Sequence, residues 1–253
     1  MTQETIMAPT ITPLPQPLPP FFGTTVVRAA FVLAFFGWGV GFYGPPIFLH
    51  TVVSRTGWSL ALVSGAVTFH FLFGAAIVVL LPRLYGRFGI PRITISGAAC
   101  LAVGVLGWSL ARSPFELFGS AALTGGGWVT MGAAAINAIV SPWYAQGRPL
   151  ALAKSYNGAS VGGIVCSSLL VLMISKTGFT ATAYIVGVVM LCIVGLIAKM
   201  VLPVTPGCIQ QSVHSSGEAT ALLIAASPKL ASSVAHSVWV NRQCQTLAGA
   251  MAL

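Results

Sequence analysis

The sequence predicts an all-α membrane protein with six transmembrane helices. Charged residues make up 6% of the 253-residue chain, and apolar residues make up 56%. A soluble domain has about 25% charged residues, so this composition cannot supply a water-facing surface. A helix needs about 20 apolar residues to cross the roughly 30 Å of hydrocarbon in a bilayer. Six uncharged runs of about the required length follow one another, at residues 29–54, 56–82, 93–111, 117–147, 155–175 and 177–198.

The first three spans follow a proline-rich leader over residues 1–24. Prolines recur throughout its second half, a composition typical of extended, disordered backbone, and we interpret the leader as cytoplasmic. Span 1 is expected over 26–48, with Pro45 and Pro46 near its far end. A turn containing Arg55 leads to span 2, and the arginine-rich loop RLYGRFGIPR then leads to span 3. Spans 2 and 3 are expected over residues 58–82 and 93–111.

The other three spans are expected over residues 115–140, 150–174 and 180–202. Together the six spans predict a transmembrane domain over residues 25–203, followed by a cytoplasmic tail over 204–253. The longest apolar run of the tail has 8 residues, which is too short to cross a bilayer. The tail ends in an apolar stretch that we interpret as the start of a truncated seventh helix.

Basic residues fall mainly on one side of the predicted bundle. The connections after spans 1, 3 and 5 hold Arg55, Arg112 and Lys176. The other side holds Arg28, Arg83, Arg87, Arg92, Arg148, Lys154, Lys199, Lys229 and Arg242. Cytoplasmic loops are enriched in Lys and Arg. We therefore predict a multi-pass protein of the cell membrane with both the N-terminus and the C-terminus in the cytoplasm.

The charged residues also exclude several function classes. The net charge of +9 comes from basic residues at helix ends rather than from a patch, so no nucleic-acid partner is expected. The chain has no Asp, and its acidic residues are Glu4, Glu116 and Glu218. Without carboxylates in the spans no catalytic triad or proton relay can be built, so we predict no enzyme activity. No metal site and no cofactor are expected.

The stretch GVGFYG, residues 39–44, matches the spacing of a dinucleotide-binding loop. That interpretation requires a preceding strand and an acidic residue about 20 positions later. The stretch instead lies inside an uncharged run and precedes Pro45 and Pro46. Its glycines therefore predict either a close approach of two helices or a local break that lines a cavity.

Two further stretches resemble the major facilitator superfamily. LYGRFGIPR resembles the family's cytoplasmic loop between helices two and three, where Arg87, Gly89 and Arg92 match and Gly86 replaces an aspartate. WYAQGRPLALAKSYNGASVGG, residues 143–163, resembles the oxalate/formate antiporter and monocarboxylate transporter branch. The residues that match in this stretch are Trp143, Arg148, Ala151, Gly158, Gly162 and Gly163.

The resemblance covers residues 30–200, about one six-helix half of a twelve-helix fold. It implies two inverted three-helix repeats, gating by the loop at Arg87, Gly89 and Arg92, and a small organic anion such as a monocarboxylate or oxalate/formate as substrate. The spacing of Gly158 and Gly162 separately predicts close helix packing.

Polar and aromatic residues inside the spans are the candidate substrate-binding residues, because such groups are costly in lipid. His70 lies near the middle of span 2 and is either a ligand or a hydrogen-bonded packing residue. The other candidates are Trp38, Tyr43, Asn137, Tyr156 and Asn157. Arg28 and Arg148 are candidate cavity-edge charges, with Lys154 beside them, and their positive potential would favour an anion.

Two functions remain open from the sequence. The first is a secondary active transporter that moves a small organic anion by alternating access. The second is a truncated, non-transporting fragment or a membrane interaction subunit. The expected partners are the anion, the lipid bilayer, and either a second half or a second copy of the chain.

Overall fold

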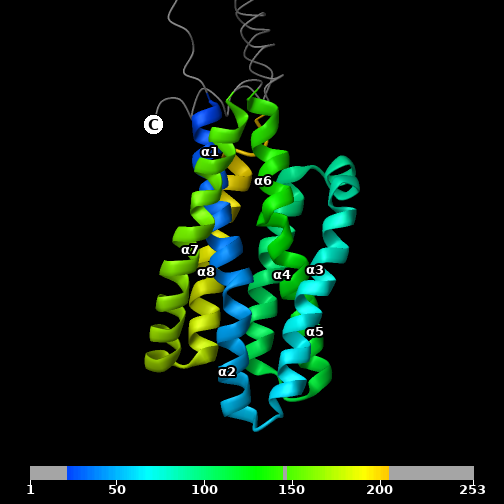
Figure 1. Cartoon of the computed structure of the whole chain (residues 1–253), viewed down its shortest axis with the longest axis vertical. Helices are drawn as coiled ribbons and strands as arrows, with labels where there is room; N and C mark the ends of the chain where they lie inside the picture. The colour runs from blue at the N-terminus through cyan, green and yellow to red at the C-terminus, as the bar shows by residue number, and fades with distance from the viewer. Residues whose placement is uncertain (1–21, 145–146, 205–253) are drawn as a thin grey trace, which may run out of the picture.

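The computed structural model describes residues 22–144 and 147–204, which form an elongated helical bundle (Figure 1). This part of the chain contains helices and no strand. Six segments are long and apolar enough to cross a membrane, which confirms the predicted all-helical, six-span architecture. Nearly all of the predicted leader and tail lies outside the described residues. Four spans are single helices, α3 (Leu60–Phe88), α4 (Ile90–Leu110), α7 (Arg148–Thr177) and α8 (Phe179–Met200).

Spans 1 and 4 are interrupted. Span 1 consists of α1 (Gly23–Phe36), the π-helical turn η1 (Gly37–Phe42) and α2 (Gly44–Thr56). Span 4 consists of α5 (Pro114–Trp128), the 3-10 turn η2 (Val129–Met131), α6 (Ala133–Val140) and the 3-10 turn η3 (Ser141–Trp143). The local break predicted from GVGFYG is confirmed in span 1. The break in span 4 was not predicted.

Two connections differ from the sequence prediction. The expected loop RLYGRFGIPR is almost entirely helical, because α3 continues to Phe88 and α4 begins at Ile90. Gly89 alone joins them, with a positive φ of 81° that suits glycine. Span 1 is also longer than predicted, so Arg55 lies in the last helical turn of α2 and not in the connection between spans 1 and 2. Its guanidinium donates a hydrogen bond of 3.0 Å to the Ala111 carbonyl at the end of α4.

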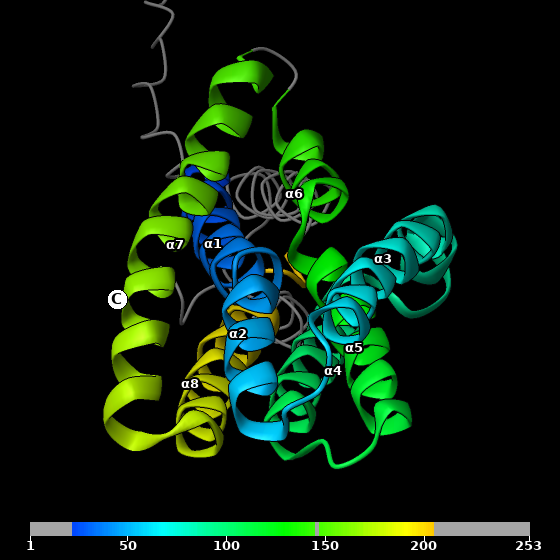
Figure 2. The ribbon, with the colours of Figure 1, turned by 60° about the horizontal axis from the view of Figure 1, so that its bottom comes forward.

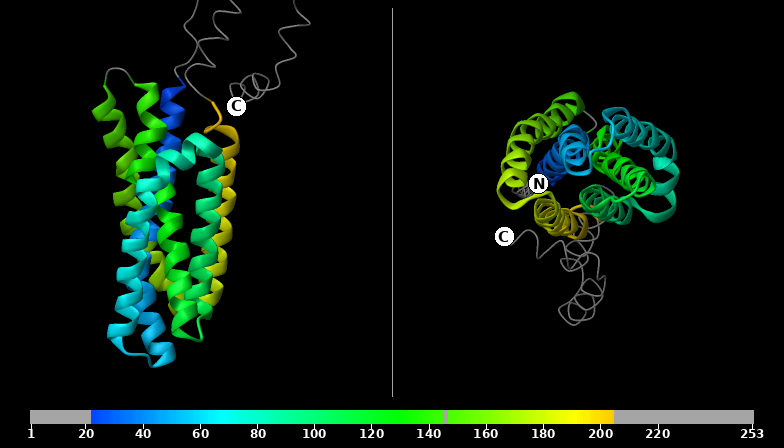
Figure 3. Two further views of the ribbon diagram at one scale, coloured as in Figure 1. Left: turned by 90° about the vertical axis from the view of Figure 1, so that its right-hand side faces the viewer. Right: turned by 90° about the horizontal axis from the view of Figure 1, so that it is seen from below.

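The six spans alternate in direction, and the first and last described residues lie at the same end of the bundle (Figure 1). The connections from α3 to α4 and from α6 to α7 lie at this end too (Figures 1 and 3). It therefore carries seven of the predicted basic residues, namely Arg28, Arg83, Arg87, Arg92, Arg148, Lys154 and Lys199. The opposite end carries Arg55, Arg112 and Lys176. The two described ends thus differ in basic charge as the sequence predicted.

Glycines bring the backbones of spans 1 and 5 together. A Cβ atom added at Gly158 would collide with the Phe31 carbonyl oxygen, and one added at Gly162 with the Phe35 carbonyl oxygen. Each pair is one helical turn apart, so α7 lies along α1 with no side chain between them. This confirms the close packing that the glycine spacing predicted. Figure 2 shows the wider arrangement, in which α7 and α3 lie on opposite flanks of α1 and α2.

We predict that Gly162→Ala lowers the melting temperature of the purified protein. The added methyl group meets backbone atoms, which cannot move aside cheaply, and overpacking of this kind costs about 1–3 kcal/mol. Gly195→Ala is the matched control, because a Cβ atom at Gly195 of α8 meets nothing within 4 Å. Thermal unfolding in detergent compares the two variants. Equal melting temperatures for both would contradict the packing argument.

Candidate functional site

The break in span 1 coincides with two prolines, which have no backbone N–H group. In an uninterrupted α-helix the carbonyl groups of residues 39–42 would accept hydrogen bonds from the N–H groups of residues 43–46. The Tyr43 N–H instead donates to the Trp38 carbonyl at 2.9 Å, and Pro45 and Pro46 have no N–H group. Three of the four α-helical hydrogen bonds that these carbonyl groups would accept are therefore missing, and the chain forms a π turn here instead.

The break in span 4 lies opposite the break in span 1. Gly132 has an extended backbone, with φ of −81° and ψ of −167°, so the helix ends after η2 and restarts as α6. A Cβ atom added at Gly37 would lie 2.9 Å from the Met131 carbonyl oxygen, and one added at Gly41 would collide with Trp128. The two interruptions therefore touch each other near the middle of the bundle, and we call this region the break site.

Three candidate residues meet at the break site. Asn137 of α6 donates a hydrogen bond of 2.6 Å from Nδ2 to the Tyr156 hydroxyl, and this hydroxyl donates to the Ala133 carbonyl at 3.1 Å. The Trp38 ring packs edge-on against the Tyr156 ring, with centroids 6.2 Å apart. All three side chains are partly exposed. Spans 1, 4 and 5 thus contribute to one polar and aromatic cluster.

Trp128 joins this cluster to a second, buried one. Its ring packs edge-on against Trp38, with centroids 6.0 Å apart, and stacks on His70 at 6.4 Å. His70 is fully buried, and its Nδ1 atom shares a hydrogen bond of 2.8 Å with the Thr124 hydroxyl. The Trp108 indole donates to the same hydroxyl at 3.3 Å. His70 is therefore a hydrogen-bonded interior residue that contacts the break site through Trp128.

The remaining candidates do not join these hydrogen bonds. Tyr43 is 40% exposed and packs edge-on against Phe42, whose ring contacts Trp128. Asn157 is exposed and lies about 100° around α7 from Tyr156, and it makes no hydrogen bond to Asn137 or Tyr156. The predicted gating residues Arg87, Gly89 and Arg92 and the predicted cavity-edge charges Arg28 and Arg148 all lie at the more basic end of the bundle. Arg87 lies over its neighbour Phe88, 5.4 Å from the ring centroid.

Sequence reasoning missed Trp108, Thr124 and Trp128. Threonine and tryptophan carry no charge, so neither residue type interrupts an uncharged run. One signal was available for Trp128: it directly follows Gly125, Gly126 and Gly127, just as Trp38 lies between two glycines. A large ring next to residues without side chains indicates a site where helices approach closely.

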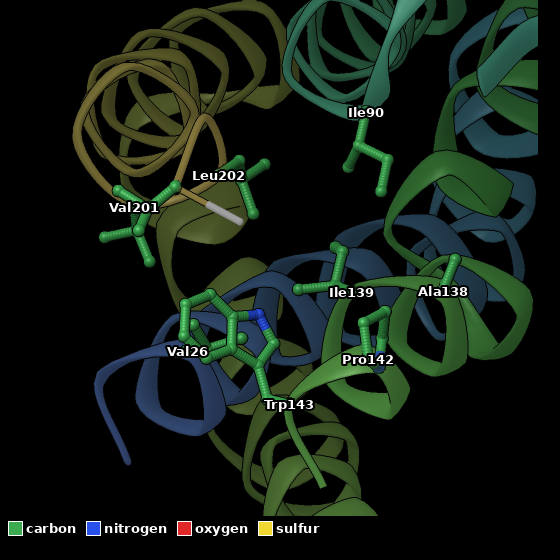
Figure 4. Close-up of a pocket in the computed structure, with 9 residues that line it drawn as sticks. Val26, Ile90, Ala138, Ile139, Pro142, Trp143, Val201 and Leu202 are labelled. Atoms are coloured by element: carbon green, nitrogen blue, oxygen red, sulfur yellow. The ribbon is translucent and has the colours of Figure 1, made fainter. Parts of the chain in front are cut away.

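A separate apolar pocket lies at the more basic end of the bundle (Figure 4). It is lined by Val26, Ile90, Ala138, Ile139, Pro142, Trp143, Val201, Leu202 and Val204. No charged side chain lines it, so it does not suit an anion. Within residues 22–144 and 147–204, no three His, Cys, Asp or Glu side chains gather as metal ligands would.

A scan against models of known protein families and a search of curated proteins gave no match for this chain.

We predict that Thr124→Val lowers the melting temperature of the purified protein. Valine has nearly the same shape but leaves the Trp108 indole and the His70 Nδ1 atom buried without their shared partner, which costs about 1–3 kcal/mol. Thr124→Ser should retain most of the stability because it keeps the hydroxyl. Thr68→Val is the control, since Thr68 is exposed and bonds only to the Ser64 carbonyl of its own helix. The prediction fails if Thr124→Val unfolds at the wild-type temperature.

Proposed function

We propose that this protein is a secondary active transporter of the major facilitator type, which moves a small organic anion by alternating access. The observation that carries the proposal is the pair of interruptions in spans 1 and 4, which face each other near the middle of the bundle. In transporters, helices broken in corresponding positions of two repeats mark the substrate site, because freed backbone groups are tolerated only beside protein or a cavity.

The order of backbone features supports two three-helix repeats. A left-handed glycine stands between spans 1 and 2 (Gly57, φ 71°, ψ 10°) and between spans 4 and 5 (Gly147, φ 72°, ψ 11°). A single glycine joins spans 2 and 3 (Gly89, φ 81°, ψ 154°) and spans 5 and 6 (Gly178, φ 84°, ψ 162°). Because each repeat has three spans, the second would be inverted relative to the first.

The packing supports the same repeats. Span 1 packs against span 5, and span 4 packs against span 2. If spans 1, 2 and 3 correspond to spans 4, 5 and 6, the contact between spans 1 and 5 corresponds to the contact between spans 4 and 2. Trp38 is the second residue of the π turn in span 1, and Trp128 directly precedes the 3-10 turn in span 4. Their rings contact each other. Equivalent residues of two repeats can touch only at the axis that relates them, so this pair marks the axis in the proposed arrangement and the centre of the substrate site.

Electrostatics supports an anionic substrate. The spans have no carboxylate near the break, and Glu116 lies in the first turn of α5, toward the less basic end. The N-terminus of α6 opens at the break, where Ala133 and Ala134 are exposed. The first N–H groups of a helix have no acceptor within it and carry partial positive charge. A carboxylate suits this position, in agreement with the resemblance to monocarboxylate and oxalate/formate transporters.

The competing proposal is a membrane interaction subunit that does not transport. It predicts a folded protein that neither binds nor moves a carboxylate. The break site favours transport, because two interruptions and a cluster of hydrogen-bonding side chains are costly in a helix bundle that serves only as an anchor.

Uptake into proteoliposomes tests the proposed transport. The purified protein should accumulate at least one of labelled oxalate, formate, lactate and pyruvate, and Tyr156→Phe should lower the initial rate about tenfold, the effect of losing about 1.4 kcal/mol of hydrogen bonding. Tyr184→Phe is the matched control, because Tyr184 is 64% exposed on α8 and away from the break site. Absence of uptake for all four anions by the wild-type protein would contradict the anion proposal.

We also propose that both termini and the Gly89 connection lie in the cytoplasm, because this end carries most of the basic residues. In a chain without native cysteines, Phe88→Cys should react with a membrane-impermeant maleimide only after the cells are opened. Ser113→Cys, at the opposite end between α4 and α5, should react in intact cells. The reverse pattern would contradict the orientation.

A further inference from the structure

The exposed face of α7 differs from the exposed faces of the other outer helices. Spans 2 and 5 are the least buried of the six, and Figures 2 and 3 show α3 and α7 on opposite flanks of the bundle. Around its middle α7 exposes Val161, Val165 and Leu169 and, beside them, a strip formed by Asn157, Ser160, Ile164 and Ser168, which we call the outer face of α7. These four residues fall within about 80° of one another around the helix, and Asn157 lies about 100° from Gly158, one of the glycines that contact α1.

The outer face of α7 lies at the depth of the hydrocarbon. The helix has 30 residues. At about 1.5 Å per residue it is about 45 Å long, which exceeds the roughly 30 Å of hydrocarbon. Asn157, Ser160 and Ser168 are all within about 8 Å of its midpoint. Their polar groups would therefore face lipid tails if nothing covered them.

Other exposed helices at this depth carry the side chains that lipid requires. On α8 the exposed residues include Val188, Val189 and Ile193, and on α3 they include Leu72 and Val79. The α3 helix also exposes Thr68, but its hydroxyl donates to the Ser64 carbonyl of its own helix. The outer face of α7 differs because it carries an amide as well as two hydroxyl groups. Polar side chains inside a membrane ordinarily face protein or water.

Asn157 has the strongest need for a partner. Ser168 donates to the Ile164 carbonyl of its own helix at 3.0 Å, and Asn137 is paired with Tyr156. Asn157 has no hydrogen bond within the described part of the chain. Its amide carries both donors and an acceptor, so it is complementary to itself.

We infer that the outer face of α7 is the contact between two copies of this chain, with Asn157 hydrogen-bonded to the second copy's Asn157. Both copies have the same orientation in the membrane, so a two-fold axis along the membrane normal brings the two amides to the same depth. Ala153 and Ser160 are small and allow the two helices to approach closely. Lys154 lies at the edge of this face near the headgroups, where its ammonium group can extend into water.

Cysteine cross-linking in membranes tests this contact. In a chain whose five native cysteines are replaced, Asn157→Cys and Ser160→Cys should form disulfide-linked dimers under mild oxidation. Leu196→Cys is the matched control and should remain monomeric. Leu196 is 59% exposed on α8, and it is as many residues from the Gly178 turn as Ser160, so the two have the same depth.

Two results of this experiment would overturn the inference. One is cross-linking that fails at both α7 positions or is equally efficient at Leu196→Cys. The other is rapid labelling of Asn157→Cys by a membrane-impermeant maleimide in the unoxidised protein, since this would place the outer face of α7 in water.

A second measurement uses the chain with its native cysteines. Energy transfer between copies labelled at the N-terminus, diluted stepwise in lipid vesicles, gives the dissociation constant of the dimer. Asn157→Leu should raise this constant about 5- to 10-fold, and Asn157→Gln should change it little because the amide is kept. An Asn157→Leu chain that dimerises as tightly as the wild type overturns the inference. Neither experiment measures uptake, so failure here leaves the proposed transport unaffected.

Discussion

A backbone N–H or carbonyl group inside a bilayer must find its hydrogen-bond partner within the protein or in a water-filled cavity, because lipid offers none. Four of the six spans satisfy this constraint as single helices. Spans 1 and 4 are interrupted, since Pro45 and Pro46 remove two donors from one and the extended Gly132 stops the other. Both interruptions lie near mid-span and press against each other. The costly backbone is thus gathered at one place, where the helices pack against each other and Ala133 and Ala134 remain exposed.

The lack of a hydrophobic driving force between helices in lipid explains the distribution of small residues. Lipid tails are as apolar as leucine, so membrane helices gain little from burying large side chains and depend on close packing instead. Gly158 and Gly162 allow α7 to rest on the Phe31 and Phe35 carbonyl groups, and Gly125 allows α5 to rest on the His70 carbonyl. These contacts hold spans 1 and 5 together and spans 2 and 4 together. They leave the break site as the place where the two pairs meet.

The number and order of the spans could be predicted because charge is excluded from hydrocarbon, and the spacing of Gly158 and Gly162 predicted their packing. The length of span 1 could not, since Arg55 looks like a loop residue until its bond to the Ala111 carbonyl is seen. The sequence grouped Asn137, Tyr156 and Asn157, but it could not show that Asn137 and Tyr156 hydrogen-bond to each other directly, since they belong to different spans. Asn157 follows Tyr156 directly, and it lies about 100° further around the helix. Trp128 was missed because its role depends on contacts with Trp38 and His70, which are distant in sequence.

Two buried polar atoms at the centre of the bundle bear on alternating access. The His70 Nε2 atom and the Trp128 Nε1 atom have no hydrogen-bond partner in the described part of the chain, although their rings stack. Each such atom costs about 1–3 kcal/mol. A transporter has at least two states, and an arrangement that opens the break to water or substrate would satisfy both atoms. Their cost therefore lowers the free energy of opening in the proposed mechanism. It does so at the contact between spans 1, 2 and 4, where the π turn and Gly132 give the backbone room to bend.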